Sequence, residues 1–189
     1  MTTLKSRKPS VEPTTSLPTL LVDGDDGAFR QFVHDLLAFS ARLQAVRDGL
    51  GAAIGLSGAE YTTLIAIAHL SANGEKVGIN MVAEHLHFSG AFITIGVNKM
   101  VALGLIAKGV DSQDRRRVIL RITPKARTLL NQLAPVQRPA NDRLFDCLTV
   151  SDFERLSKRL PMMVDAADDV LRTLEAYSAA KKRRSAGEG

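Results

Sequence analysis

Three consecutive arginines, Arg115, Arg116 and Arg117, form the group in this sequence whose type and spacing point most directly to a chemical role. They belong to a stretch, residues 108–127, in which seven side chains are basic and only Asp111 and Asp114 are acidic. Neighbouring positive charges repel one another unless a polyanion lies close by. The triplet therefore indicates a site for a phosphate polymer or, taken by itself, an ordinary solvated turn.

The arginines lie where two short segments that are typical of β-strands, residues 105–110 and 116–122, are joined by residues 111–115. In the second segment Val118, Leu120 and Ile122 occupy every second position, which is the pattern of a strand with one buried face. The residues between the two segments are polar. This order predicts a β-hairpin with the arginines at its tip.

A helix is expected just before the hairpin. Ser89 is a good N-cap residue, and Gly104 is typical of the position that follows a helix C-terminus. The residues that recur at helical spacing, and should form its buried stripe, are Ile93, Val97, Met100 and Leu103. The opposite face is mostly small or polar and carries Gly90, Ala91, Thr94, Ile95, Asn98 and Lys99.

A shorter helix is expected over residues 79–86, separated from Ser89 by a tight turn at His87 and Phe88. Helix, turn, helix and basic hairpin follow one another in the order of a winged helix-turn-helix. In that context DNA binding explains the arginines better than a solvated turn does. The predicted DNA contacts are Ser89, Gly90, Ala91, Thr94, Ile95, Asn98, Lys99, Asp114, Arg115, Arg116 and Arg117.

Several runs of residues in this segment together form a family pattern. They are Val82, Ala83, Glu84, His85 and Leu86 in the first helix, Thr94 and residues 100–106 in the second, Asp114, Arg115 and Arg116 in the hairpin, and residues 122–126 after it. With these runs, residues 27–175 resemble the MarR family of bacterial transcription regulators. That family has an Asp-x-Arg in the wing and a Leu-Thr that opens the next helix, which Asp114, Arg116, Ile122 and Thr123 match.

The resemblance implies a homodimeric repressor of a catabolic or efflux operon, which binds a pseudo-palindromic double-stranded DNA operator and releases it when a small molecule binds. It also implies that Arg116 enters the minor groove and that Asp114 braces the wing. In similar proteins the common effectors are aromatic carboxylates or their coenzyme A thioesters, held between the dimer helices and the DNA-reading lobe. One position departs from the family, because Ile95 replaces the arginine that often follows the helix threonine; an apolar side chain there suits a thymine methyl group.

The rest of the chain is expected to frame this segment. Hydrophobic residues make up 45% of the sequence, charged residues make up 24%, and the net charge is +5, as in a soluble globular protein with a basic bias. We predict a mostly α fold with a small β-hairpin wing. The single domain, residues 23–178, should combine a winged helix-turn-helix lobe at about 57–123 with dimerisation helices at about 25–53 and 124–176. Residues 1–22 are expected to form a disordered arm and residues 179–189 a disordered basic tail.

Caps define several of the expected boundaries. Ser57 and Glu60 form a capping box for a helix that runs to about residue 72. The last helix should open near Thr149, or at Ser151 with Glu154 as a second capping box. Residues 76–78 are expected to form a short third strand beside the wing.

Apolar stripes on the outer helices predict self-association. In the first long helix an apolar residue recurs every seven positions, at Phe29, Leu36, Leu43 and Leu50. The stripe of the last helix comprises Phe153, Leu156, Leu160, Val164, Ala167, Val170, Leu171 and Leu174. A small winged-helix core cannot cover both stripes, so we expect a homodimer.

Five side chains are candidates for a small-molecule pocket: Phe39, Arg42, Arg47, Tyr61 and His69. Arg42 and Arg47 lie on the first long helix and suit an anionic ligand, although a solvated helix face is the commoner reason for such residues. Tyr61 and His69 are the polar exceptions on an otherwise apolar helix. They either line a cavity or are core residues with satisfied hydrogen bonds, and the second explanation is favoured.

Several functions find no support in the sequence. It contains no HExxH metal motif, phosphate-binding loop or GxSxG nucleophile motif, so neither an enzyme nor a cofactor is predicted. His85 and His87 are two residues apart and do not share a helix face, so no metal site is expected. A lone Cys147 and the lack of a membrane-length apolar run predict a cytoplasmic protein with no membrane partner. The alternative is a winged helix that binds proteins without sequence-specific DNA binding, which the wing arginines count against.

Overall fold

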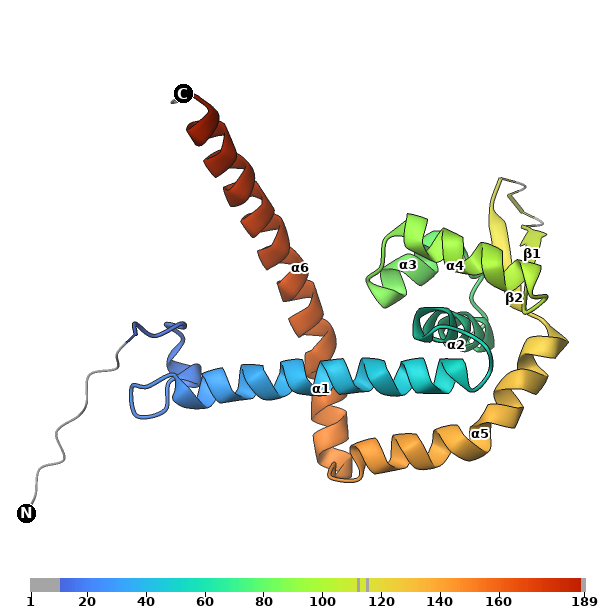
Figure 1. The fold of residues 1–189 in the computed structure, drawn as a ribbon, viewed down its shortest axis with the longest axis horizontal. Coiled ribbons are helices and arrows are strands. Elements are labelled where there is room, and N and C mark those ends of the chain that lie inside the picture. The colour runs from blue at the N-terminus through green and yellow to red at the C-terminus, as the bar shows by residue number, and fades with distance from the viewer. Residues whose placement is uncertain (1–10, 112, 115, 188–189) are drawn as a thin grey trace, which may run out of the picture. The chain divides into compact units, whose positions relative to one another are not determined.

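The structure is a computed structural model that describes residues 11–111, 113–114 and 116–187. Within these residues helices dominate, and two antiparallel strands form a single small sheet (Figure 1). The prediction of a mostly α fold with a β-hairpin is confirmed. Contacts divide the chain into two compact units, Met1–Arg138 and Pro139–Gly189, where the sequence predicted one domain.

The first unit is assembled around one central helix. Its elements are α1 (Gly27–Ala52), α2 (Gly58–Ala72), α3 (Ile79–Leu86), α4 (Gly90–Ala102), β1 (Ile106–Val110), β2 (Val118–Ile122) and the start of α5 (Pro124–Phe145). Helix α2 is in contact with α1, α3, α4 and β2 (Figure 1). Because it is apolar nearly all round, it can bury several faces at once.

The core of this unit includes side chains from α1 to α5, from both strands and from the loops that precede α2 and α3. The largest that are fully buried are Tyr61, Leu64, Ile67, Ile93, Met100, Leu120, Val77, Val82, Val97 and Thr63. The predicted stripe on α4 is therefore confirmed at three of its four positions. It is wrong at Leu103, which is 40% exposed, because the helix ends at Ala102 and Leu103 forms its C-cap.

The hairpin pairs Ile106 with Ile122 at its base and Val110 with Val118 at its outer end. Both valines are exposed, so only the base of the hairpin belongs to the core. The predicted third strand at residues 76–78 is wrong: the Val77 carbonyl accepts one backbone hydrogen bond from Leu120, at 2.8 Å, and no strand is formed. The chain turns away because Gly78 is already the N-cap of α3.

Serine caps fix the starts of α2 and α4, as predicted. The Ser57 hydroxyl accepts from the Glu60 backbone N–H, and the Glu60 carboxylate accepts from the Ser57 backbone N–H. The Ser89 hydroxyl accepts from the Phe92 backbone N–H at 3.2 Å. Gly104 follows α4 with φ +69°, a left-handed conformation that glycine adopts without strain.

The second unit contains the end of α5 and the 38-residue helix α6 (Val150–Gly187). Thr149 caps α6, because its hydroxyl and backbone N–H exchange hydrogen bonds with Asp152. The predicted capping box of Ser151 and Glu154 is wrong, since both residues already lie inside the helix. Residues 179–187, predicted as a disordered tail, continue the helix.

The segment before α1 is also more ordered than predicted. The Asp26 carboxylate accepts from the Thr14 backbone N–H at 2.6 Å and from the Arg30 side chain at 2.9 Å. The Arg30 guanidinium, and after it the Thr14 N–H, hold the pKa of Asp26 at about 2. Residues 11–22 are thus tied to the start of α1, while the remainder of the predicted arm, residues 1–10, lies outside the described residues.

Candidate nucleic-acid interface

The outer face of α4 consists of Ala91, Ile95, Asn98 and Ala102, all of which are exposed. Their spacing places them along one side of the helix, opposite the buried residues. Ile95 lies in the middle of this face and is 72% exposed. An exposed helix face of this kind, next to a hairpin, is the element that enters a major groove in helix-turn-helix proteins.

Three polar residues of α4 that were predicted to contact DNA have partners within the first unit. The Thr94 hydroxyl donates to the Gly90 carbonyl at 2.7 Å. The Lys108 ammonium donates to the Asn98 side-chain oxygen at 2.6 Å, which ties α4 to β1. Lys99 forms an ion pair with Glu60, at 2.8 Å. A bidentate contact between Asn98 and adenine therefore requires Lys108 to release the amide oxygen.

Ser89 and Gly90 lie where predicted, at the N-terminus of α4. Ser89 is exposed and Gly90 is half-buried. The first backbone N–H groups of a helix lack intrahelical partners and favour a nearby phosphate. One of these groups, the Phe92 N–H, already donates to the Ser89 hydroxyl and is therefore not available to a phosphate.

The wing, residues 106–122, exposes Arg116 and Arg117, and hydrogen bonds of its own acidic residues hold its backbone. Asp114 accepts from the Arg116 backbone N–H through its carboxylate, at 3.0 Å, and from the Arg117 backbone N–H through its carbonyl, at 2.9 Å. Arg116 and Arg117 are exposed. Arg115 lies outside the described residues. The geometry gives Asp114 the bracing position that the family resemblance implies.

Asp111 is a second brace, which sequence reasoning missed. It is buried, and its carboxylate accepts from the Gln113 backbone N–H at 2.9 Å and from the Lys76 ammonium at 2.9 Å. These two donors, the Gln113 N–H first, hold the pKa of Asp111 below its usual value. Lys76 is 35 residues away in sequence, so no local pattern signals the pair. It joins the wing to the loop that leads into α3.

Glu60 connects the cap of α2 to α4. Burial alone would raise the pKa of Glu60, but the Lys99 ammonium and the Ser57 backbone N–H outweigh it and hold that pKa below its usual value. The carboxylate therefore stays ionised at neutral pH. Since one residue serves both as a capping-box partner and as the partner of Lys99, it fixes α4 relative to α2.

Of the five candidate ligand residues, the structure brings two together. The Arg47 guanidinium carbon lies 5.2 Å from the centre of the Tyr61 ring, and its Nε donates to the Thr62 hydroxyl at 2.9 Å. Tyr61 is fully buried, and its hydroxyl has no hydrogen-bond partner among the described residues. Burial raises the pKa of Tyr61, against the opposing effect of Arg47.

The other three candidates do not join this pair. Arg42 donates to the Ala38 carbonyl on the same helix, which is the behaviour of a surface arginine. His69 is exposed two turns further along α2, where its ring stacks on that of His85 at 6.0 Å. Phe39 is exposed two turns before Arg47 on α1.

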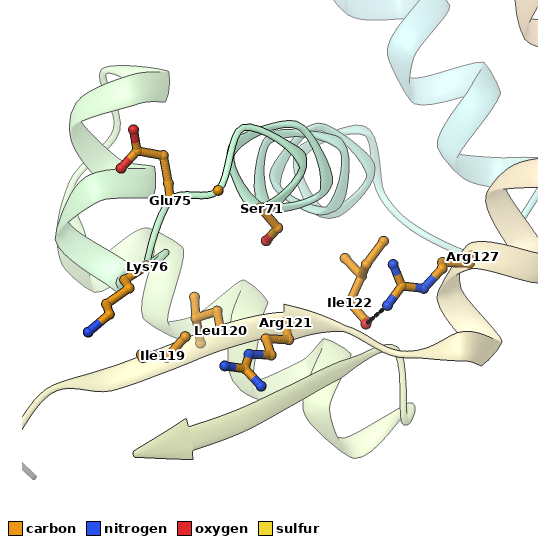
Figure 2. Close-up of a pocket in the computed structure, with 9 residues that line it drawn as sticks. Ser71, Glu75, Lys76, Ile119, Leu120, Arg121, Ile122 and Arg127 are labelled. Carbon is orange, nitrogen blue, oxygen red and sulfur yellow. Dashed lines mark hydrogen bonds between the residues drawn. The ribbon is translucent and has the colours of Figure 1, made fainter. Parts of the chain in front are cut away.

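A groove of about 320 Å³ lies between the end of α2, β2 and the start of α5 (Figure 2). Leu120 and Ile122 point from β2 toward Ser71, and Arg127 lies over Ile122, whose carbonyl accepts from it at 3.5 Å (Figure 2). The Ser71 hydroxyl is buried and has no partner among the described residues. With Lys76, Glu75 and Arg121 also lining it, the groove combines an apolar wall with three basic side chains and one carboxylate. No pattern of residues in the sequence predicted this groove.

The residues that the structure describes contain no group of three or more histidine, cysteine, aspartate or glutamate side chains placed to hold a metal ion. None of their helices is both long and apolar enough to span a membrane.

Comparison with known proteins gives matches in structure. No protein-family model and no curated protein matches the sequence. The transcription regulator MarR from Oenococcus oeni PSU-1 is 20% identical, with a TM-score of 0.60 over 71% of this chain and 98% of that chain. CouR from Rhodococcus jostii RHA1, bound to p-coumaroyl-CoA, is 19% identical, with a TM-score of 0.60 over 69% of this chain and 90% of that chain.

A third match is S. aureus MepR, whose structure is a complex with DNA. It is 16% identical, with a TM-score of 0.54, and the match covers 80% of this chain and 99% of that chain. All three proteins match nearly their full length, so the likeness includes the helices outside the winged-helix lobe. The chain therefore has the winged-helix fold of the MarR family of transcription regulators.

Proposed function

We propose that this protein is a DNA-binding transcription regulator that acts as a homodimer and responds to a small molecule. The observation that carries the proposal is the exposed outer face of α4 beside the exposed Arg116 and Arg117 of a braced wing. A helix in the major groove and a basic wing on the neighbouring backbone or minor groove together contact DNA over a continuous surface.

The wing is suited to a phosphate polymer for a physical reason. Its acidic residues have partners of their own, since Asp114 is engaged by backbone N–H groups and Asp111 chiefly by Gln113 and Lys76, with a smaller electrostatic contribution from Arg117. The exposed side chains of Arg116 and Arg117 can therefore meet an external anion. Neutralising phosphates releases counterions, so such binding should weaken steeply as salt increases.

Dimerisation is supported by the apolar stripe of α6. Phe153, Leu160, Leu171 and Leu174 are all more than two-fifths exposed. A stripe of this length leaves a large apolar surface in water unless a partner covers it. We propose that a second copy of the chain covers it, as the family resemblance implies, and that the dimer presents two copies of α4 to a two-fold symmetric operator.

For the effector we propose an anionic aromatic compound, a carboxylate or its coenzyme A thioester. The bound p-coumaroyl-CoA of CouR supports this class, and Arg47 supplies a cation over the ring of Tyr61, whose buried hydroxyl has no hydrogen-bond partner among the described residues. The groove at Arg127 is a second location with the same chemistry. A ligand that binds the DNA-incompetent state better shifts the population away from DNA by that difference in affinity.

Thermal-shift measurements with benzoate and p-coumaroyl-CoA distinguish the two locations. If the effector binds beside Tyr61, Arg47→Ala should abolish the ligand-induced rise in melting temperature and Arg127→Ala should not. The reverse result would assign the effector to the groove of Figure 2. No rise with either ligand in the unsubstituted protein would contradict the proposed effector class.

The alternative is a winged helix that binds another protein. Mobility shift with heparin as competitor separates the two functions: duplexes enriched from a random pool by the full-length chain should remain bound, while random duplexes should not. Arg116→Ala and Arg117→Ala should each weaken the retained complex. A chain that enriches no sequence, and that heparin removes from every duplex, would support the alternative instead.

A further inference from the structure

The outer face of α4 is unusual for a DNA-reading surface because its most prominent group is apolar. Ile95, in the middle of this face, is a four-carbon aliphatic side chain and is 72% exposed. Ala91 precedes it by one helical turn and is also exposed. Phe92, on the flank toward α2, is nearly half exposed and lies edge-on against Phe88 at 5.1 Å.

The polar groups around Ile95 are already engaged. The Thr94 hydroxyl donates a hydrogen bond to the Gly90 carbonyl, and the Asn98 amide oxygen accepts one from the Lys108 ammonium at 2.6 Å. Lys99 is drawn toward α2 by Glu60. Reading a base by hydrogen bonds needs free donors and acceptors in a fixed arrangement, for example both ends of an Asn amide for adenine. Of the four residues on this face, Ala91, Ile95 and Ala102 are aliphatic, and the one polar side chain, Asn98, has its oxygen held by Lys108.

We propose that Ile95 is a specificity-determining residue that reads the C5-methyl group of thymine in each operator half-site. This inference rests on the DNA-binding function proposed above. Thymine is the one base that presents a methyl group in the major groove, and apolar side chains recognise it by direct contact. The contact removes two apolar groups from water at once and needs no hydrogen-bond partner.

The supporting elements hold Ile95 in place for such a contact. The buried Ile93, Val97 and Met100 fix the rotation of α4 about its axis. Lys108 ties the helix to β1, and Lys99 ties it to α2 through Glu60. The branched Ile95 side chain itself has few rotamers in a helix, so little conformational freedom is lost when DNA binds.

The test uses duplexes enriched from a random pool by the full-length protein. Each thymine of the enriched sequence is replaced in turn by deoxyuridine, which keeps base pairing and removes only the methyl group, and the Kd is measured by fluorescence anisotropy. The same series is measured for Ile95→Ala and for the conservative variant Ile95→Val. Because Ile95 is on the surface, neither change should disturb the fold, which circular dichroism checks.

At one thymine in each half-site, loss of the methyl group should raise the Kd of the unsubstituted protein about fourfold, which is the effect of burying one methyl-sized group. Ile95→Ala should bind the thymine duplex more weakly and be insensitive to deoxyuridine at that position. Ile95→Val should retain most of the sensitivity. This pattern would place the contact between Ile95 and the methyl group.

Three outcomes overturn the inference, and they have different meanings. Enriched duplexes that are insensitive to deoxyuridine at every position would show specific DNA binding without methyl recognition, and the proposed function would stand. Sensitivity that persists unchanged in Ile95→Ala would assign the contact to another side chain. A pool from which no sequence is enriched over random DNA would contradict the proposed function itself.

Discussion

The winged-helix lobe and α6 differ in how far their apolar side chains are buried. In the lobe, α2, α3, α4 and β2 bury a shared core that includes Leu64, Ile67 and Met100. In α6, none of the described residues is buried, and large apolar side chains such as Phe153 and Leu171 are exposed. Both regions carry apolar residues at helical spacing, but only the lobe contains its own partners for them.

The same pattern, apolar residues at helical spacing, can therefore lead to two different structural outcomes. An apolar stripe that meets other elements of its own unit specifies a fold. A stripe of comparable length that is left exposed favours association with another molecule. Its contribution to stability then depends on protein concentration. The lobe should therefore account for reading DNA and α6 for pairing two lobes.

Charging the α6 stripe should have the largest effect. Leu171→Asp together with Leu174→Asp would place unpaired charges in the proposed seam, at about 3–5 kcal/mol for each uncompensated charge. We expect monomers in sedimentation equilibrium and a loss of operator affinity of at least about a hundredfold, because one lobe covers only half of a two-fold site. Thr173→Asp with Ala176→Asp, on the opposite side of the helix, adds the same charge and should leave the dimer intact. A charged-stripe variant that stays dimeric contradicts the seam.

Truncating the lobe core should cost about 2–5 kcal/mol of unfolding free energy. Leu64 is fully buried, so Leu64→Ala removes its contacts and leaves a cavity. We expect this loss to be the same at low and high protein concentration in urea denaturation, whereas the effect of Leu160→Ala in α6 should depend on concentration. A Leu64→Ala effect that grows with concentration would mean that the lobe, too, is stabilised mainly by association.

Removing a wing arginine should weaken DNA binding by about 1–3 kcal/mol. Arg116→Ala should lower affinity for all duplexes and reduce the slope of log Kd against log salt concentration, since fewer counterions are released. The matched control is Arg155→Ala, which removes the same charge from α6. Equal effects of the two substitutions, measured by anisotropy between low and high salt, would show that net charge rather than the wing carries the binding.

The smallest effect concerns the segment before α1. Because the folded pKa of Asp26 is about 2, below the ordinary carboxylate value near 4, its stabilising effect is fully present above pH 4 and is lost as the pH falls toward 2. Asp26→Asn should therefore be less stable than the unsubstituted protein at pH 7, and the two should converge near pH 2. A difference in melting temperature that is independent of pH would exclude the ionised Asp26 carboxylate as its source.

The local features of the lobe could be predicted from sequence because each is determined by residues only a few positions apart. Ser89 with the helix that follows, the Ser57–Glu60 capping box, and Gly104 after α4 are short-range signals with a fixed geometry. The buried face of α4 follows from the period of the helix alone.

What the sequence did not reveal depends on partners that are distant along the chain. The pairs Lys76–Asp111, Lys108–Asn98 and Lys99–Glu60 join different elements, and nothing near either residue of a pair marks the other. Those pairs change the candidate site, since they occupy polar groups that residue type alone assigned to DNA. The start of α6 was left open between two positions for a different reason: Thr149 with Asp152 and Ser151 with Glu154 are both acceptable caps, and only the fold selects the first.

We propose that two copies of α4, each flanked by its wing, read one DNA site. Hydroxyl-radical footprinting of the full-length protein on a duplex enriched from a random pool tests it most directly. We expect two protected segments on one side of the duplex, related by pseudo-two-fold symmetry and centred about one helical turn, ~34 Å, apart. A single protected segment, or uniform weak protection along the duplex, would contradict the account.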